Sequence, residues 1–210
     1  MLIHQKSKRN LHLELVKKFW TRHLRSGDYA VDATCGNGHD TLFLAQQEGI
    51  SVVSLDIQKE ALQNTALLLE KSLSLEVQKK VLLVEQSHST FPPFSKPPRL
   101  IIYNLGYLPG GDKNVTTKTE TTLQSLRSAL QILAPDGAIS LMCYPGHAEG
   151  LLEQEAIINF LDSLKSSYTY ERYHYTDPPH RDFQLHIPEN SFCNRFPNFF
   201  WICSRASAIK

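Results

Sequence analysis

The stretch from Tyr29 to Ala45 constrains the fold of this chain more than any other. A short apolar run, Tyr29–Val31, leads into Asp32, and the chain then passes two glycines, Gly36 and Gly38. The residues that follow are good helix formers with an apolar face. A strand, a glycine-bearing turn and a helix in this order form the unit that holds a nucleotide-like ligand at the edge of an α/β sheet.

A second acid follows the next predicted strand. A second strand is expected over residues 51–55, and it leads directly into Asp56. An acid in this position can accept hydrogen bonds from both hydroxyls of a ribose. Together with the glycine turn, Asp56 predicts a ligand that contains a nucleoside.

The rest of the chain continues the alternation of strand and helix. Further strands are expected at 81–84, 100–103, 138–143, 168–175 and 198–203, and helices at 13–24, 40–48, 61–73, 123–133 and 157–164. Alternation of this kind predicts parallel strands joined by right-handed crossovers, with helices on both faces of the sheet. The last two strands have no helical pattern between them, so one strand should run antiparallel in a C-terminal hairpin. We therefore expect residues 1–210 to form one Rossmann-like α/β domain with a mostly parallel, seven-stranded sheet.

The composition narrows the class of protein. The chain has 210 residues, of which 41% are hydrophobic and 20% charged, and a formal net charge of +1, which argues against disorder and against a strongly basic nucleic-acid binder. Residues 1–27 are expected to form an amphipathic basic helix, which indicates either a polyanionic partner or a solvated helix face. No run reaches the length of a membrane span, and the four cysteines form no zinc-type pair, so we expect a cytoplasmic protein without a metal site.

The residues around the glycine turn discriminate between ligand classes. A phosphate-binding P-loop needs a lysine that this turn lacks, and a dinucleotide turn needs a third glycine where Thr41 stands. Three acids, Asp32, Asp40 and Asp56, favour a positively charged ligand over a phosphate. S-adenosylmethionine carries an ammonium, a sulfonium and no phosphate, so it fits this turn best. The alternative for Asp40 alone is an acid that complements the dipole of the helix.

Four segments of the chain resemble a known family. They are residues 32–45 (DATCGNGHDTLFLA), 56–58 (DIQ), 104–113 (NLGYLPGGDK) and 144–147 (YPGH). These segments resemble the bacterial and chloroplast tRNA 5-(aminomethyl)-2-thiouridine methyltransferases, which were long catalogued as rRNA methylases. The resemblance implies a class I methyltransferase fold, S-adenosylmethionine as cofactor, and the wobble uridine in the anticodon loop of tRNA as substrate.

The resemblance also implies which residues contact the cofactor. These are Asp32, Gly36, Asn37, Gly38, His39, Asp40, Thr41, Asp56, Ile57, Gln58, Ser87, His88 and Asn104. His39 is expected to shape the glycine turn, and Ser87 and His88 to lie beside the adenine or ribose. A surface turn is the alternative for the last two.

Four residues are candidates for the methyl-transfer step. Asn104 can accept a hydrogen bond from an amine and so orient its lone pair, and Tyr107 can stack on a base. Asp112 and His147 are candidate proton acceptors. The alternatives are a turn of Asx type at Asn104 and a loop histidine at His147 that serves only the local structure.

The remaining features leave several functions open. Residues 177–197 form a long loop that is expected to contact the substrate. Methylation of rRNA or of a small-molecule amine is a second hypothesis, and an RNA-binding protein without catalysis is a third. The sequence leaves the oligomeric state open, and a homodimer is one of the alternatives.

Overall fold

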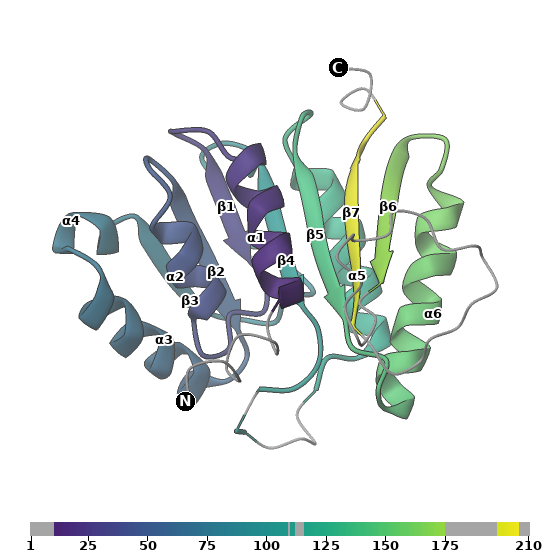
Figure 1. The fold of residues 1–210 in the computed structure, drawn as a ribbon, viewed down its shortest axis with the longest axis horizontal. Helices are drawn as coiled ribbons and strands as arrows, with labels where there is room; N and C mark the ends of the chain where they lie inside the picture. Colours follow the sequence, from purple (N-terminus) through teal and green to yellow (C-terminus); the bar gives the residue numbers. More distant parts are fainter. Residues whose placement is uncertain (1–10, 109, 112–115, 175–196, 206–210) are drawn as a thin grey trace, which may run out of the picture.

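A computed structural model of the chain describes residues 11–108, 110–111, 116–174 and 197–205. Seven strands form one sheet in the order β3-β2-β1-β4-β5-β7-β6, which crosses Figure 1 from β3 at one edge to β6 at the other. The strands are β1 (Tyr29–Asp32), β2 (Ser51–Asp56), β3 (Val81–Glu85), β4 (Leu100–Asn104), β5 (Ala138–Cys143), β6 (Tyr168–His174) and β7 (Asn198–Ser204). The helices are α1 (Leu11–His23), α2 (His39–Ala45), α3 (Lys59–Ser72), α4 (Leu75–Gln78), α5 (Thr119–Ile132) and α6 (Ala148–Ser163).

The strand directions confirm the predicted fold class. β1 pairs in parallel with β2 and β4, and β2–β3 and β4–β5 are also parallel. β7 runs antiparallel to both of its neighbours, β5 and β6. This reversed strand is the one that the C-terminal hairpin predicts.

Two hydrophobic clusters cover the two faces of the sheet. On one face, side chains of β1, β2, β4 and β5 pack against Leu126 and Ala129 of α5 and against Ile157 and Leu161 of α6. On the other face, alternate residues of the same strands pack against α1 and α2. Because the strands are covered on both faces, they read as continuous apolar runs, as in β4, where Leu100, Ile101 and Ile102 are all buried.

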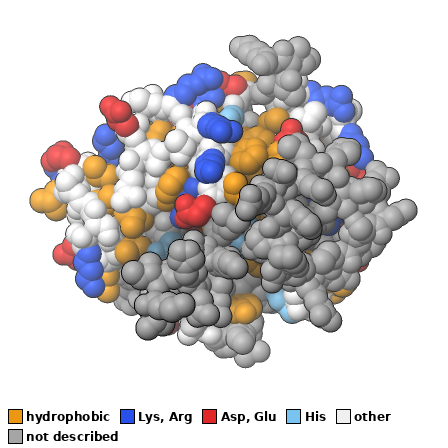
Figure 2. Space-filling view, in the orientation of Figure 1, with side chains coloured by type: hydrophobic (Ala, Val, Ile, Leu, Met, Phe, Trp, Pro, Cys, Tyr) orange, Lys and Arg blue, Asp and Glu red, His pale blue; other side chains and the backbone are white. Residues whose placement is uncertain are grey.

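Helix α1 lies in front of the sheet in Figure 1 and is fixed there by an aromatic residue. Val16 and Trp20 are buried, and Trp20 Nε1 donates a hydrogen bond of 2.8 Å to Ser140 Oγ on β5. The polar side of α1 carries the exposed Lys18 and Arg22, and Figure 2 shows basic side chains gathered over this helix. The structure thus has the basic amphipathic helix from residue 11 onward, and residues 1–10 lie outside the described part of the chain.

Between β3 and β4, residues 86–99 contain no helix, as the four prolines of this segment predict. Elsewhere, two helices differ from expectation in their bounds and one further helix was not expected. Helix α2 ends at Ala45, whereas the expected helix extends to residue 48. Helix α6 begins at Ala148, whereas the apolar spacing marks a helix only from residue 157. The short helix α4 has no buried residue, so the hydrophobic pattern could not reveal it. Of the expected substrate loop 177–197, all but Pro197 lies outside the described residues.

Candidate functional site

The candidate site lies where three neighbouring parallel strands end. β1 ends at Asp32, β2 at Asp56 and β4 at Asn104. The register pairs Asp32 with Ser54 and with Ile102, so these strand ends meet at the same edge of the sheet. This is the edge at which open α/β sheets bind ligands.

The glycine turn after β1 has the geometry that its sequence predicts. Gly36 and Gly38 have φ angles of 51° and 79°, which residues with a side chain rarely adopt. A Cβ atom at Gly38 would lie 2.7 Å from Thr65 Oγ1 of α3 and 2.9 Å from Thr65 Cα. Thr65 Oγ1 in turn donates to the carbonyl oxygen of Gly36 over 2.9 Å. The turn is therefore packed against α3. Both this contact and the backbone angle require a glycine at position 38.

Asp56 binds both to the glycine turn and to the segment that follows β2. Its Oδ2 accepts from the backbone N–H of Gly36 over 2.9 Å, and its Oδ1 accepts from that of Gln58 over 2.9 Å. A carboxylate has about four acceptor positions, so each oxygen can accept a further hydrogen bond. Ile57 is 55% exposed, an unusual position for a large apolar side chain, and it offers a surface on which a base can pack.

Asp32 is the most deeply buried of the three acids. Its side chain is 1% exposed and accepts from Thr41 Oγ1 over 2.7 Å and from the backbone N–H of Thr34 over 3.3 Å. Thr41 Oγ1 also lies 2.9 Å from Ser54 Oγ. Asp32 and Thr41 thus join β1 and β2 to the first turn of α2. Burial, with a smaller contribution from the Asp40 carboxylate, raises the pKa of Asp32 to about 7.

Asp40 faces two groups that the sequence does not reveal as its partners. Its Oδ1 lies 3.8 Å from Lys17 Nζ of α1, and these side chains are 14% and 18% exposed. Its Oδ2 accepts from Asn104 Nδ2 over 3.4 Å. Burial raises the pKa of Asp40, and Lys17 opposes that rise. Lys17 is therefore a site residue that the sequence analysis missed, and its place on an amphipathic helix gave no sign of it.

Asn104 stands at the centre of this edge of the sheet. Its backbone N–H donates to Thr34 Oγ1 over 2.8 Å, which joins the end of β4 to the turn after β1. Burial raises the pKa of the hydroxyl of Tyr144, the residue after β5, and the Asn104 side chain opposes that rise. Its Oδ1 is buried, and no described residue hydrogen-bonds it. The sequence analysis missed Tyr144 as a site residue, although its position directly after a parallel strand could have indicated it.

The structure describes three of the four residues proposed for methyl transfer, and Asp112 lies outside the described residues. The ring centroids of Tyr107 and His147 lie 6.4 Å apart, and Tyr107 is 43% exposed. His147 is the N-cap of α6, where its Nδ1 accepts from the backbone N–H of Gly150 over 3.1 Å. A neutral imidazole that accepts at Nδ1 carries its proton at Nε2. This hydrogen bond supports the structural alternative for His147.

The side chains of Ser87 and His88 make their contacts within the protein. Ser87 Oγ donates to Ser89 Oγ over 3.0 Å. His88 is buried with its ring edge-on to Tyr103, at a centroid distance of 6.1 Å. Burial lowers the pKa of His88 to about 4, so its imidazole is neutral at pH 7. Contacts of this segment with a cofactor remain a prediction.

A buried carboxylate fixes the base of the loop that follows β4. Glu153 of α6 is 3% exposed and accepts from Thr122 Oγ1 over 2.6 Å and from Thr117 Oγ1 over 3.0 Å. Thr117 Oγ1 itself accepts from the backbone N–H of Gly106, and an isolated bridge pairs Tyr107 with Thr116. The two ends of the loop are thereby held together below Tyr107. The sequence analysis missed Glu153 because nothing in its surroundings distinguishes it from the exposed acids of α6.

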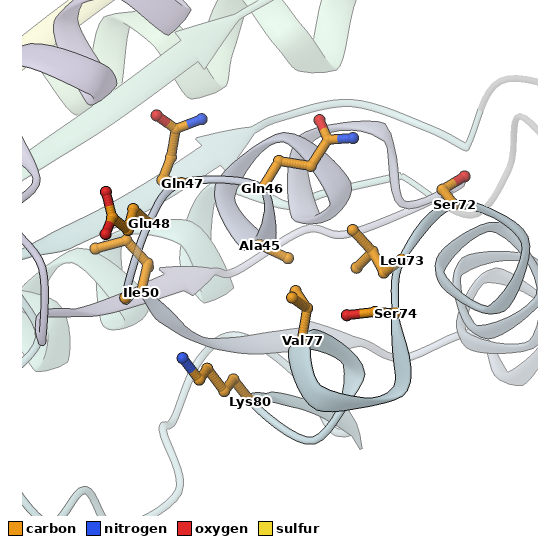
Figure 3. A pocket seen from close by; sticks show the side chains of 11 residues that line it. Ala45, Gln46, Gln47, Glu48, Ile50, Ser72, Leu73, Ser74, Val77 and Lys80 are labelled. Carbon is orange, nitrogen blue, oxygen red and sulfur yellow. The ribbon is translucent and has the colours of Figure 1, made fainter.

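Other parts of the described structure add no residues to the candidate site. A groove of about 420 Å³ lies between the end of α2 and α4, at the amino ends of β2 and β3 and thus away from the candidate site (Figure 3). Within the described residues, no three His, Cys, Asp or Glu side chains gather as a metal-binding group. No helix among them has the length and apolar character needed to cross a bilayer.

Comparisons with known proteins identify the family. The model of the family described as "Putative rRNA methylase" matches residues 52–187, a range that includes Asp56, Asn104 and Tyr144. A chloroplastic tRNA (mnm(5)s(2)U34)-methyltransferase of Arabidopsis thaliana is 37% identical over 164 residues, which cover 73% of this chain and 60% of that protein. The chain thus spans less than two thirds of the length of this relative.

Solved structures agree with the sequence comparisons. A Clostridium thermocellum protein described as an rRNA-methylase is 30% identical, with a TM-score of 0.76 over 91% of this chain and 96% of that one. A Streptococcus mutans protein, solved in complex with SAH, is 30% identical, with a TM-score of 0.70 over 90% and 96% of the two chains. The fold, the strand-end site and these matches lead to one conclusion: the chain belongs to the rRNA methylase family.

Proposed function

We propose that this protein is an S-adenosylmethionine-dependent methyltransferase that methylates the amine of 5-aminomethyl-2-thiouridine at the wobble position of tRNA. One observation carries the proposal: Asn104 Oδ1 is a buried acceptor without a described partner, at the edge where the ligand of such a sheet binds. The name of the Arabidopsis relative supports the substrate, and the S. mutans complex with SAH supports the cofactor.

The residues at the strand ends fit this cofactor. Asp56 has acceptor positions left for ribose hydroxyls, and the exposed Ile57 beside it can pack against adenine. Asp32 and Asp40 add negative charge near the glycine turn, which suits the ammonium and sulfonium groups. When bound, S-adenosylmethionine supplies a methyl group on a positively charged sulfur.

Asn104 would act on the amine that receives the methyl group. An alkyl amine is mostly protonated at neutral pH, so the site must bind the free base or accept a proton. Asn104 Oδ1 can accept one N–H of the neutral amine, which directs the nitrogen lone pair towards the methyl carbon. The cofactor would supply the methyl carbon to that lone pair, with the new nitrogen–carbon bond replacing the carbon–sulfur bond, and the product amine would lose a proton. Much of the rate would come from this positioning.

Other features support the RNA part of the proposal. Tyr107 is exposed beside the site and can stack on the target base or its neighbour. The basic side of α1 suits the phosphates of an anticodon loop. Cys35, Cys143 and Cys203 are free thiols, in keeping with the cytoplasmic location that we propose.

Transfer of a labelled methyl group tests the proposal against its alternatives. The protein would be incubated with tritiated S-adenosylmethionine and separate fractions of tRNA, rRNA and small-molecule amines, each from cells that lack this protein. Label in tRNA supports the proposal, whereas label only in rRNA or in the small-molecule fraction assigns another substrate. The absence of label from every fraction would favour an RNA-binding protein without catalysis.

A further inference from the structure

The two ends of the Asn104 amide have different surroundings. Nδ2 donates to Asp40 Oδ2 over 3.4 Å. Oδ1 is buried and has no partner among the described residues. The amide nitrogen therefore faces the protein, and the amide oxygen remains available to a substrate.

The orientation of this amide decides whether it can serve an amine. A rotation of the Asn104 amide by half a turn exchanges oxygen and nitrogen, which have nearly the same shape. In the rotated state an amide N–H would face the substrate amine. It would donate a hydrogen bond to the nitrogen lone pair that has to attack the methyl group. An ionised carboxylate can only accept hydrogen bonds, so Asp40 favours the orientation in which Nδ2 faces it.

Lys17 supports the ionised state of Asp40. Lys17 Nζ lies 3.8 Å from Asp40 Oδ1, and α1 is anchored nearby by the hydrogen bond from Trp20 to Ser140. Burial raises the pKa of Asp40, whereas Lys17, the amide of Asn104 and His39 lower it.

Two other titratable groups also lie close to Asp40. The charge of Asp40 raises the pKa of Asp32 and that of the Tyr144 hydroxyl. Among the described residues, Lys17 is the cation that another element of the fold places beside Asp40.

We propose that Asp40 and Lys17 are positioning residues that hold the Asn104 amide in one orientation, with Oδ1 presented to the substrate amine. This inference rests on the proposed function, and it gives Asp40 a role other than the cofactor contact expected from the sequence. Lys17 thereby supports the orientation of the amide without touching the reacting atoms.

Asp40→Asn tests the orientation directly. An asparagine at this position can donate as well as accept, so both orientations of the Asn104 amide become satisfied. We expect kcat to fall by about tenfold to hundredfold. Glu48→Gln removes an exposed acid just after α2 and is the matched control.

A double variant separates positioning from cofactor binding. Lys17→Met together with Asp40→Asn removes one charge of each sign, so the net charge beside the cofactor is unchanged. We expect the dissociation constant for S-adenosylmethionine, measured by calorimetry, to stay within about twofold of wild type while kcat falls as in Asp40→Asn. Loss of cofactor binding in this variant would make Asp40 a cofactor residue and overturn the inference.

Lys17→Met alone provides a pH readout that a purely structural role would not change. Without Lys17 the pKa of Asp40 rises further, so more of this acid is protonated as the pH falls. The ratio of the variant kcat to the wild-type kcat should therefore decrease as the pH is lowered, by up to about tenfold for each unit of pKa change. This ratio cancels the protonation of the substrate amine, which is the same for both proteins. Lys18→Met, an exposed position on the same helix, should leave the ratio constant.

If wild type methylates the aminomethyl substrate and Asp40→Asn does so at the same rate, the inference fails and the proposed function stands. If wild type does not methylate this substrate at all, the proposed function itself fails.

Discussion

The backbone N–H of Gly36 donates to Asp56 Oδ2 over 2.9 Å, although the two residues lie 20 positions apart in the chain. The glycine turn after β1 and the acid at the end of β2 are therefore one structural unit. Asp56→Asn keeps the shape of the side chain but replaces one acceptor oxygen by a donor. We expect the affinity for S-adenosylmethionine to fall at least about tenfold in calorimetry, because a ribose hydroxyl loses its charged acceptor. Unchanged affinity would remove Asp56 from the cofactor site.

Asn104→Ala should separate chemistry from cofactor binding. The variant loses the acceptor Oδ1 but keeps the backbone N–H that donates to Thr34 Oγ1, so the end of β4 keeps its place. We expect kcat to fall by about a hundredfold or more, with the dissociation constant for the cofactor largely unchanged. Methyl transfer at a near wild-type rate would show that Asn104 serves only the structure of the turn.

The affinity for the cofactor should depend on pH because of Asp32. Burial raises the pKa of this acid to about 7, so it is about half protonated at neutral pH before the ligand binds. A cation nearby favours the ionised form, so binding releases a proton and becomes tighter as the pH rises towards 7. We expect the affinity to rise by up to about tenfold per pH unit below that value.

Calorimetry in buffers of different ionisation enthalpy would measure this proton release. Asp32→Asn should bind S-adenosylmethionine with a much weaker dependence on pH. Adenosine, which carries no positive charge, is the matched probe and should bind wild type with nearly constant affinity. A pH dependence that is equal for the two ligands would contradict the role of Asp32.

Gly38→Ala should destabilise the whole domain. Its Cβ would lie 2.7 Å from Thr65 Oγ1, and its φ of 79° is unfavourable for alanine. We expect the free energy of unfolding in urea to decrease by about 1–3 kcal/mol. Gly146→Ala is the control, since a Cβ there meets nothing within 4 Å and the φ of Gly146 lies outside the left-handed region. Equal stabilities of the two variants would show that the packing of the turn against α3 is unimportant.

Glu153→Gln should loosen the base of the loop that carries Tyr107. Both oxygens of Glu153 accept hydrogen bonds from threonine hydroxyls, and an amide nitrogen cannot replace the second acceptor. We expect a loss of about 1–3 kcal/mol in the free energy of unfolding and a higher KM for the RNA substrate. Glu155→Gln, an exposed neighbour on α6, should change neither quantity. A wild-type KM in Glu153→Gln would mean that the loop does not depend on this carboxylate.

The fold could be read from the sequence because local patterns and tertiary packing agree. β5 was predicted with its observed bounds, since its residues are buried on both faces and give a continuous apolar run. The absence of a helical pattern between the last two strands predicted a hairpin with one antiparallel strand, and the structure shows that this strand is β7. Where packing gives no apolar signal, as in α4, the sequence predicted nothing.

The site could be predicted only in part, because sequence spacing shows which element carries a residue but not which neighbours face it. The glycine turn, Asp56 and Asn104 were predicted as site residues because each was expected at the end of a strand, where ligands bind in this fold class, and the structure has all three at strand ends. Lys17 comes from α1, which packs on the same face of the sheet as α2 although the two helices are separated in the sequence, so its pairing with Asp40 is visible only in three dimensions.

The most direct test of the account is nucleoside mass spectrometry of an anticodon stem-loop RNA that carries 5-aminomethyl-2-thiouridine at the wobble position. The RNA would be treated with the purified protein and S-adenosylmethionine, with Asn104→Ala as the inactive control. The account predicts a gain of one methyl group on the exocyclic amine of this nucleoside with wild type, and almost none with the variant. The account would be contradicted if the protein binds the cofactor and methylates another RNA position or another amine but leaves this wobble nucleoside unmodified.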